Sequence, residues 1–317
     1  MPEFSELPIL DISPLSGNSA IEKEALARDF ARIYGELGFG YITGHGIDPT
    51  LIDAVFEQNR RFHDLPVTEK LKITLNEVHR GYIPYDTSTD VNSDFAEVTR
   101  PNQSESFMMM REDAVADPSV YLSGPNQWPD LPGFREVLEN YALALTALGD
   151  RLMRLALTAI GAGEGFMSAF DTPTTWLRLL HYPPSPAESP DDLYGSAPHC
   201  DFGCLTLLAQ DAVGGLQVMP RGGDWIDAPH IPGTFVVNVG DMLNRLSNDR
   251  LLSTPHRVIN RTGQERYSVP FFYDPHVSTE IAPLPGTGKA KFESLKFGDY
   301  LRKELGDAYL AHGAELP

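Results

Sequence analysis

The stretch "APHCDFGCLTLLAQDAVGGLQV", residues 197–218, places a histidine and an aspartate two positions apart at the start of an apolar run with the composition of a β-strand. Side chains at positions i and i+2 of a strand point to the same face, so His199 and Asp201 project together, with Cys200 facing the opposite way. An imidazole and a carboxylate on one face are able to bind the same metal ion. This pair therefore predicts a metal site inside a β-rich segment.

Short β-rich segments lie on both sides of this pair. They are "TWLRLLHY", "CLTLLAQ", "GLQVM", "TFVVNVG", "HRVIN" and "RYSVPFFY", and they are separated by Gly, Pro and Asn. Many short strands between turn residues are typical of an antiparallel sandwich or barrel rather than of alternating βαβ units. We therefore expect residues 174–282 to form a β core.

A third metal ligand is available in "STPHRVIN", where His256 follows His199 by 57 residues. Local structure cannot bring these two histidines together, so the fold has to do so. Two imidazoles and one carboxylate on one side of an ion form the 2-His-1-carboxylate facial triad, which suits Fe(II) and leaves coordination positions open. A zinc site more often has a fourth protein ligand or a single water. The three residues therefore favour iron.

The strand "RYSVPFF" begins ten residues after His256 and again carries two polar side chains on one face. Arg266 and Ser268 share that face, and Tyr267 points the opposite way. A guanidinium binds two carboxylate oxygens in parallel and stays charged when it is desolvated, so Arg266 and Ser268 together are suited to hold a carboxylate. The alternative is an ion pair between Arg266 and an acidic neighbour.

In combination, the H-x-D pair, the distal histidine and the R-x-S motif resemble the isopenicillin N synthase-like branch of the Fe(II)/2-oxoglutarate-dependent oxygenase superfamily. Further segments are similar to this family: "LPILDISPL" with "GFGYITGHGI", "RLLHYPP", and "VNVGDMLNRLSNDRLLSTPHRVIN". The resemblance covers nearly the whole chain. It implies an α+β fold with a double-stranded β-helix (jelly-roll) core and flanking helices.

The resemblance also assigns roles to individual residues. The implied metal ligands are His199, Asp201 and His256. The implied cosubstrate-binding residues are Arg266 and Ser268, as a clamp on the distal carboxylate of 2-oxoglutarate, and Tyr182. One position departs from the plant relatives, which commonly have Asn where this chain has Leu180. The implied cofactor is Fe(II), with 2-oxoglutarate and O₂ as cosubstrates.

The implied activity is that of a dioxygenase that oxidises an unactivated C–H bond of a small molecule and releases succinate and CO₂. Hydroxylation is the expected outcome, and the protein positions the C–H bond and excludes water. Three other interpretations stay open at this point. They are an Fe(II) oxidase of the same family that does not use 2-oxoglutarate but retains the R-x-S motif, a non-catalytic jelly-roll binding protein with a vestigial site, and a zinc hydrolase.

Substrate-pocket residues are expected on the strand face that carries Arg266 and in the irregular, proline-punctuated segment 80–131. Alternation places Phe272 on that face. The other candidates are Tyr82, Phe107, Arg111 and Arg178. An arginine that faces the pocket would favour an anionic substrate such as an amino acid. The alternative for Arg111 or Arg178 is a surface or core ion pair.

The chain is expected to form one oxygenase domain. An N-terminal helical and irregular region covers residues 1–131, a long helix region covers 132–173, the jelly-roll core covers 174–282, and a C-terminal helix lies in 283–317. Apolar side chains at helical spacing predict a first helix after a capping box formed by Ser19 and Glu22. The same spacing predicts a long helix over residues 134–160.

The formal net charge of −19 over 317 residues repels phosphate backbones and anionic membrane surfaces. No apolar stretch reaches the roughly 20 residues needed to span a bilayer, and "MPEFSELPIL" lacks the features of a signal peptide. The two cysteines, Cys200 and Cys204, are too few for a disulfide framework. We therefore expect a cytoplasmic monomer or homodimer with a small-molecule substrate and no nucleic-acid or membrane partner.

Overall fold

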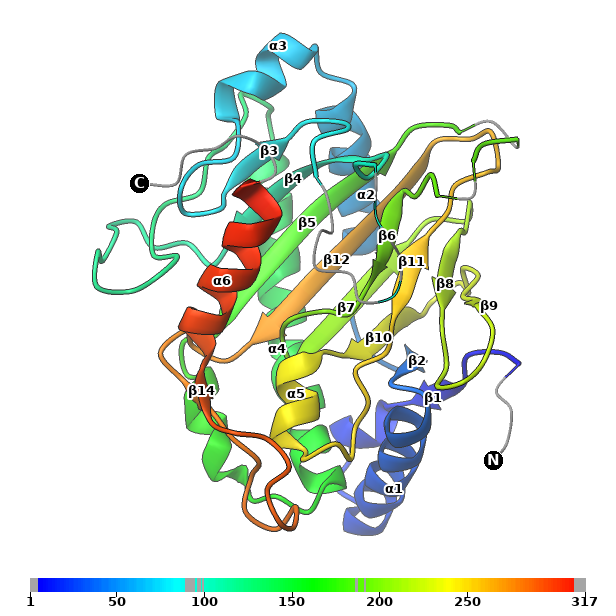
Figure 1. Cartoon of the computed structure of the whole chain (residues 1–317), viewed down its shortest axis with the longest axis vertical. Coiled ribbons are helices and arrows are strands. Elements are labelled where there is room, and N and C mark those ends of the chain that lie inside the picture. Colours follow the sequence, from blue (N-terminus) through cyan, green and yellow to red (C-terminus); the bar gives the residue numbers. More distant parts are fainter. Residues whose placement is uncertain are drawn as a thin grey trace.

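Two β-sheets face each other at the centre of the molecule (Figure 1). The computed structural model describes residues 5–88, 95, 98, 100–185, 188–190 and 192–310, without the side chains of 307–310. The major sheet has the strand order β1-β2-β10-β7-β12-β5-β4-β3, and the minor sheet has the order β6-β11-β8-β9. Neighbouring strands in both sheets are antiparallel, except that β1 and β2 are parallel.

The major sheet consists of β1 (Ile9–Asp11), β2 (Phe39–Thr43), β3 (Gly81–Ile83), β4 (Glu105–Met110), β5 (Thr174–Tyr182), β7 (Leu205–Gln210), β10 (Phe235–Val239) and β12 (Arg266–Asp274). The minor sheet consists of β6 (Ser196–His199), β8 (Leu216–Val218), β9 (Ile226–Asp227) and β11 (His256–Val258). A separate small sheet pairs β13 (Glu280–Ile281) with β14 (Leu295–Lys296).

The strands between residues 174 and 274 form two facing layers. β5, β12, β7 and β10 are neighbours in the major sheet, and β6, β11, β8 and β9 make up the minor sheet. Side chains from both layers pack together in one buried cluster, which includes Leu180, Tyr182, Val218 and Val258. The predicted double-stranded β-helix core is therefore confirmed.

Two of the helices of the molecule cover the opposite face of the major sheet. The α-helices are α1 (Ala20–Glu36), α2 (Pro49–His63), α3 (Val67–Lys70), α4 (Phe134–Ala159), α5 (Asp241–Leu246) and α6 (Phe297–Leu310), and the 3-10 helices are η1 (Ser13–Ser16), η2 (Leu71–Ile73) and η3 (Glu164–Phe170). Figure 1 shows α2 and α4 behind the major sheet. We call the face toward α2 and α4 the back face, and the face toward the minor sheet the front face.

The first two helical predictions agree with the structure. The hydroxyl of Ser19 accepts a hydrogen bond from the backbone N–H of Glu22 at 3.3 Å and caps α1. The long helix α4 packs on the back face through a stripe at helical spacing. Its fully buried side chains include Phe134, Leu138, Tyr141, Leu145, Leu148 and Leu152. The core therefore lies between α4 and the back face, as the apolar periodicity indicates.

The segment 80–131 is more regular than its sequence indicates. It contains β3 and β4, which extend the major sheet beyond β5. All six residues of β4, "ESFMMM", are buried. A strand that is covered on both faces shows no alternation of polar and apolar residues, so its period-2 signal is lost. The prediction of an irregular segment is therefore wrong for these two strands.

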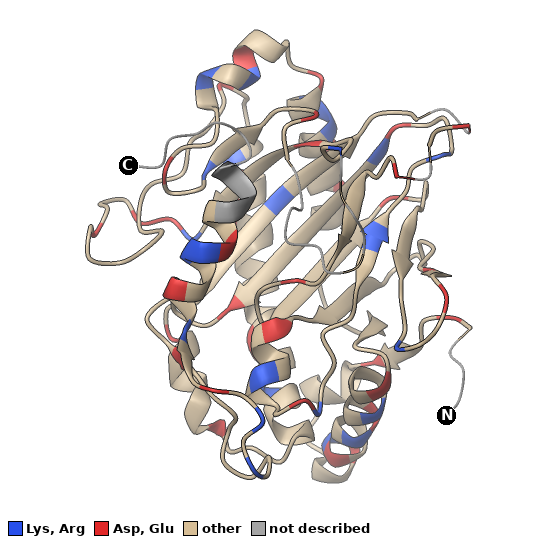
Figure 2. Ribbon diagram, viewed as in Figure 1, with Lys and Arg blue, Asp and Glu red and all other residues tan. Residues whose placement is uncertain are grey.

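Charged residues lie mostly outside the two sheets (Figure 2). The strands are mostly tan in that view, whereas α1 carries both acidic and basic residues along its length. Burying a charge on a central strand is costly without a partner. Arg266 on β12 is fully buried and Arg178 on β5 is partly buried, so the partners of both side chains have to be identified. Within the described residues, no helix combines the length and the apolar character needed to cross a membrane.

Candidate functional site

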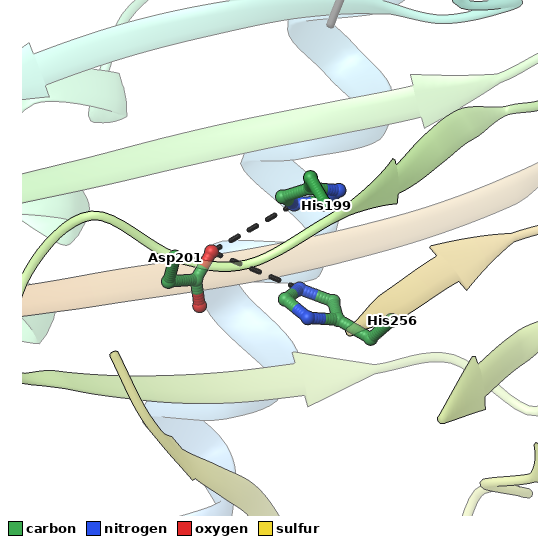
Figure 3. Close-up of side chains that lie close together, drawn as sticks. All are labelled: His199, Asp201 and His256. Atoms are coloured by element: carbon green, nitrogen blue, oxygen red, sulfur yellow. Dashed lines mark ion pairs between the residues drawn. The ribbon is translucent and has the colours of Figure 1, made fainter. Parts of the chain in front are cut away.

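Three side chains converge between the two sheets (Figure 3). His199 ends β6 and His256 begins β11, and these two residues are direct partners in the antiparallel pairing of the two strands. The Nε2 atom of each histidine lies 3.7 Å from Oδ1 of Asp201. One ligand atom from each of the three residues lies within 4.8 Å of the others. The pairing of β6 with β11 thus closes the long gap in the sequence between the two histidines.

Asp201 reaches this position from outside any strand. β6 ends at His199, and Asp201 lies in the connection to β7, where the chain passes from the minor sheet to the major sheet. Its backbone carbonyl accepts a hydrogen bond from the N–H of Asp241 at 2.9 Å. The prediction that His199 and Asp201 share one strand is therefore wrong, although their side chains converge. The direction of the carboxylate is therefore set by the turn between the sheets and not by the alternation of side chains along a strand.

Backbone carbonyls orient both imidazoles. Nδ1 of His199 lies 2.7 Å from the carbonyl oxygen of Ala197, and Nδ1 of His256 lies 3.3 Å from that of Thr254. Because a carbonyl oxygen only accepts hydrogen bonds, Nδ1 carries the proton in each ring. The Nε2 atom then presents its lone pair, which is the form of histidine that binds a metal ion.

The carboxylate of Asp201 is held through one oxygen. Its Oδ2 accepts a hydrogen bond from Nδ2 of Asn238 at 2.7 Å and another from the hydroxyl of Thr206. Burial acts to raise the pKa of Asp201, but His256, His199 and these two hydrogen bonds outweigh it and lower the pKa. The group is therefore an anion with Oδ1 directed toward the histidines.

This donor set fits Fe(II). Two imidazole nitrogens and one carboxylate oxygen meet on one side of a common point, which is the facial arrangement that leaves positions open for other ligands. Within the part of the chain that the structure describes, it is the only group of three or more such side chains close enough to hold one ion. Among the same residues, no further cysteine, histidine or carboxylate joins the group to complete a closed zinc site.

Arg266 forms a second polar position on the front face. The side chain is fully buried, with Nε donating to the carbonyl of Gly214 at 2.6 Å and Nη1 donating to Oγ of Ser268 at 3.3 Å. Its Cζ lies 4.6 Å from the ring centroid of Tyr182, whose hydroxyl is 3.5 Å from Oγ of Ser268. The three predicted cosubstrate residues are thus in mutual contact.

One nitrogen of this buried guanidinium has no partner among the described residues. Nη2 of Arg266 makes no hydrogen bond with them, and none of their carboxylates forms an ion pair with it. The alternative of an ion pair with an acidic neighbour is therefore not observed. A buried cation without a counter-charge is unfavourable, and an anionic ligand at Nη2 and Ser268 would compensate it.

Two of the predicted pocket residues lie on the front face. Phe272 is paired with Thr206 of β7 on one side and with Trp176 of β5 on the other. Because Thr206 contacts the candidate ligand Asp201, this row of side chains runs past the metal position. Arg178 lies on the same face of β5 as Leu180 and Tyr182, by strand alternation.

The other three predicted pocket residues lie elsewhere. The ring of Phe107 is 5.1 Å from that of Phe134, and the ring of Tyr82 is 5.9 Å from that of Phe62, so both side chains pack against helices on the back face. Arg111 is 39% exposed and forms an ion pair with Asp113 at 2.8 Å. The assignment of Tyr82, Phe107 and Arg111 to the pocket is therefore corrected. The face of the sheet on which such side chains lie depends on the pairing of β3 and β4, and it could not be predicted from the sequence alone.

Asn238 and Thr206 are site residues that were not predicted from the sequence. They are direct partners across β10 and β7, and both bind Oδ2 of Asp201. A signal for Asn238 was present, because it is the only polar side chain in the strand "FVVNV". A polar residue inside an apolar central strand needs a partner when it is buried.

Comparison with known proteins agrees with this geometry. The sequence profile of the 2OG-Fe(II) oxygenase superfamily matches residues 173–275, and the profile described as non-haem dioxygenase in morphine synthesis N-terminal matches residues 7–131. The chain is 35% identical to the 2-oxoglutarate-Fe(II) type oxidoreductase hxnY of Emericella nidulans, over 95% of this chain and 90% of the relative. It is 34% identical to a homoarginine-6-hydroxylase of Glycine max, over 94% and 96% of the two chains.

Solved structures show the same likeness. A full-length Neurospora crassa protein in complex with alpha-KG (2-oxoglutarate) and thymine has a TM-score of 0.85 at 30% identity, and the match covers 97% of this chain and 99% of that protein. A 2OG-Fe(II) oxygenase family protein from Caulobacter crescentus has a TM-score of 0.81 at 28% identity, with coverage of 96% and 99%. Both likenesses extend over the full jelly-roll core and the helices behind it.

Proposed function

The chain belongs to the 2OG-Fe(II) oxygenase superfamily, and from this premise we propose that His199, Asp201 and His256 bind the Fe(II) of a 2-oxoglutarate-dependent dioxygenase. We assign the distal carboxylate of 2-oxoglutarate to Arg266 and Ser268, with Tyr182 beside it. The reaction oxidises a C–H bond of a small molecule by hydroxylation and releases succinate and CO₂.

The unpaired guanidinium of Arg266 is the observation that supports the cosubstrate assignment. It is fully buried, its Nη2 has no partner among the described residues, and its neighbour Ser268 offers a hydroxyl on the same side. A carboxylate placed there receives a charge-assisted hydrogen bond and neutralises the buried cation. A vestigial site would have no reason to maintain an uncompensated charge inside the protein.

The described side chains perform distinct tasks around this chemistry. Bound Fe(II), together with 2-oxoglutarate and O₂, supplies the oxidising power for breaking the C–H bond. Asn238 and Thr206 hold Oδ2 of Asp201, so that Oδ1 stays directed at the metal position. Phe272 offers an aromatic surface in the row next to Thr206, on which a substrate can rest with water excluded.

The substrate is proposed to be a small polar metabolite. A homoarginine hydroxylase is among the relatives, and thymine is bound in a similar structure. A front-face pocket that combines Phe272 with Arg178 suits a molecule of this size and polarity. We also propose a cytoplasmic location, because Cys200 and Cys204 are both free thiols, as is usual in a reducing compartment. A monomer or homodimer stays the prediction for the oligomeric state.

The test is anaerobic addition of Fe(II) and then 2-oxoglutarate to metal-free protein. We expect the weak visible charge-transfer band of the Fe(II) chelate with 2-oxoglutarate in the wild type. Arg266→Ala should weaken binding of 2-oxoglutarate on the order of 100-fold or more, because a buried charge-assisted contact is lost. Arg111→Ala is the matched control, since it removes an arginine that is already paired with Asp113.

Two results would contradict the proposal. If iron binds and no band forms in the wild type, 2-oxoglutarate does not chelate the metal in this protein. If Arg266→Ala and Arg111→Ala bind 2-oxoglutarate as tightly as the wild type, Arg266 is not the carboxylate receptor. Loss of iron binding in His199→Ala, measured in parallel, tests the metal assignment separately.

A further inference from the structure

Arg178 is a second arginine on the front face, in the middle of β5. In the pairing of β5 with β12, Tyr182 lies opposite Arg266 and Leu180 lies opposite Ser268. Side chains alternate along a strand, so Arg178 projects from the same face as Leu180 and Tyr182. It therefore shares the space between the sheets with the residues assigned to 2-oxoglutarate.

The guanidinium of Arg178 has no counter-charge among the described residues. Its Nε donates to Oγ of Ser106 on β4 at 2.8 Å. Its two Nη groups make no hydrogen bond or ion pair with the residues that the structure describes. Arg111, by comparison, pairs with Asp113 at 2.8 Å, as is easily arranged in a chain with a net charge of −19. The partly buried Arg178 has no such acidic partner among the same residues.

The surroundings of Arg178 on the front face are apolar. Met108 of β4 is paired with Arg178, Trp176 and Leu180 flank it on its own strand, and Phe272 of β12 lies diagonally from it, opposite Trp176. A pocket of hydrophobic and aromatic side chains with one charged group is typical of a small-molecule site, where the charge sets the orientation of the ligand. Ser106, which is fully buried, fixes the guanidinium by holding its Nε.

The position of Arg178 relative to the metal sets a length for the ligand. Asp201 is anchored to Thr206 on β7, and β5 is separated from β7 by β12 alone. Trp176 is the residue of β5 in register with Thr206, so Arg178 is displaced by two strand spacings and by two residues along the strand, which together amount to ~12 Å between backbone positions. A ligand group bound by Arg178 therefore lies at a distance from the metal that a small molecule can span, with Phe272 of β12 beneath it.

We propose that Arg178 binds a carboxylate of the substrate, so that the substrates of this enzyme are small carboxylic acids oxidised at a carbon several bonds away from that carboxylate. The proposal rests on the proposed function. Ser106 is a positioning residue that leaves both Nη groups available for the two carboxylate oxygens. A primary amide of the same molecule lacks the charge and one acceptor, so it should bind poorly.

The experiment compares small carboxylic acids with their own primary amides. The probes are L-homoarginine, hexanoic acid and the amide of each, with thymine as a neutral compound, and the readout is succinate released above the level without a probe. We expect at least one acid to exceed its amide in kcat/KM by roughly 100-fold. Arg178→Gln should bring this ratio close to one, Arg178→Lys should retain part of it, and Arg111→Gln should leave it unchanged.

Several outcomes overturn the inference. The first is succinate release with an amide or thymine that equals the release with the acids. The second is no increase in succinate release with either acid. The third is a ratio of acid to amide that Arg178→Gln leaves unchanged. The charge-transfer band of bound 2-oxoglutarate is recorded in every variant and separates this result from the proposed function. Absence of the band in the wild type overturns both proposals, whereas a normal band with no preference for acids overturns this one alone. If Arg178→Gln loses the band, the ratio of acid to amide in kcat/KM is taken from Arg178→Lys instead, and an unchanged ratio in that variant overturns the inference.

Discussion

Nδ2 of Asn238 lies 2.7 Å from Oδ2 of Asp201, and this hydrogen bond holds the carboxylate oxygen that is not directed at the histidines. Asn238 is on β10 of the major sheet, whereas His199 and His256 belong to the minor sheet. The bond therefore ties Asp201, which lies in the connection between the two sheets, to the major sheet. It restricts the rotation of the carboxylate and keeps Oδ1 in place for an ion.

Replacing Asn238 should weaken metal binding. Asn238→Ala removes a partner that orients a ligand, and such changes typically lower metal affinity about 10- to 100-fold. The measurement is anaerobic titration with Fe(II). Asn244→Ala is the control. Like Asn238, Asn244 donates a short side-chain hydrogen bond, but its acceptor is the backbone carbonyl of Leu251 and it does not contact Asp201. Equal Fe(II) affinity in the two variants would show that Asn238 does not orient the carboxylate.

Glu105, on the back face of the major sheet, should contribute strongly to the stability of the folded protein. Its buried carboxylate accepts hydrogen bonds from Nζ of Lys70 at 2.8 Å, from Nδ1 of His181 at 2.9 Å, and from the hydroxyl of Tyr82. Glu105→Gln leaves the buried ammonium of Lys70 without a counter-charge, and we expect a loss of about 3–5 kcal/mol in the free energy of unfolding. Urea unfolding measures this loss.

The control for Glu105 is an exposed ion pair of the same kind. Glu69→Gln removes the partner of Lys72, whose side chain is 66% exposed, and should lower the free energy of unfolding by less than about 1 kcal/mol. A loss in Glu105→Gln as small as that in Glu69→Gln would mean that the buried pair contributes no more than a surface pair.

Acid should remove the contribution of Glu105. Burial acts to raise its pKa, but the hydrogen bonds from His181, Lys70 and Tyr82 outweigh it and lower the pKa from 4.5 to about 2. A carboxyl whose pKa is lower in the folded state stabilises the protein fully above its unfolded pKa. This stabilisation decreases as the pH falls from 4.5 toward 2.

The expected effect is a loss on the order of 3 kcal/mol across that range. It is measured as the difference in free energy of unfolding between the wild type and Glu105→Gln at several pH values. The difference should shrink as the pH falls below 4.5. A difference that stays constant from neutral pH to the lowest pH at which both proteins fold would contradict the assignment.

The packing of α4 on the sheet should depend on Gly149. A Cβ atom at this position would lie 2.6 Å from Cγ of Tyr273, whose buried ring is stacked on Phe170 and has little room to move. We expect Gly149→Ala to destabilise the protein by about 1–2 kcal/mol, because overpacking exceeds the gain in helix propensity. Thermal unfolding measures the change.

Gly165→Ala is the control for this substitution. A Cβ atom at Gly165, within η3, has open space around it. This variant should be neutral or slightly more stable, since alanine restricts the unfolded chain. Fe(II) affinity should be unchanged in both variants. Equal stability of Gly149→Ala and the wild type would show that α4 moves away from the sheet without penalty.

Local patterns determined most of the elements and the chemical character of the site. The stripe of α4, the cap at Ser19 and the polar face shared by Arg266 and Ser268 each depend on residues close in sequence, and their periodicity is a property of the helix or strand itself. The H-x-D pair and the downstream histidine identify a site of two imidazoles and a carboxylate by residue type alone.

The relative positions of these elements were decided by the tertiary structure. The pairing of β6 with β11 brings His256 to His199, and the crossing between the sheets, rather than one strand, aims Asp201. The pairing of β3, β4 and β5 places Arg178 on the front face and puts Tyr82 and Phe107 on the back face. A shift of one residue in such a pairing exchanges the two faces, and register is set by contacts distant in sequence. Side-chain chemistry could therefore be predicted from the sequence, whereas the partners of each side chain could not.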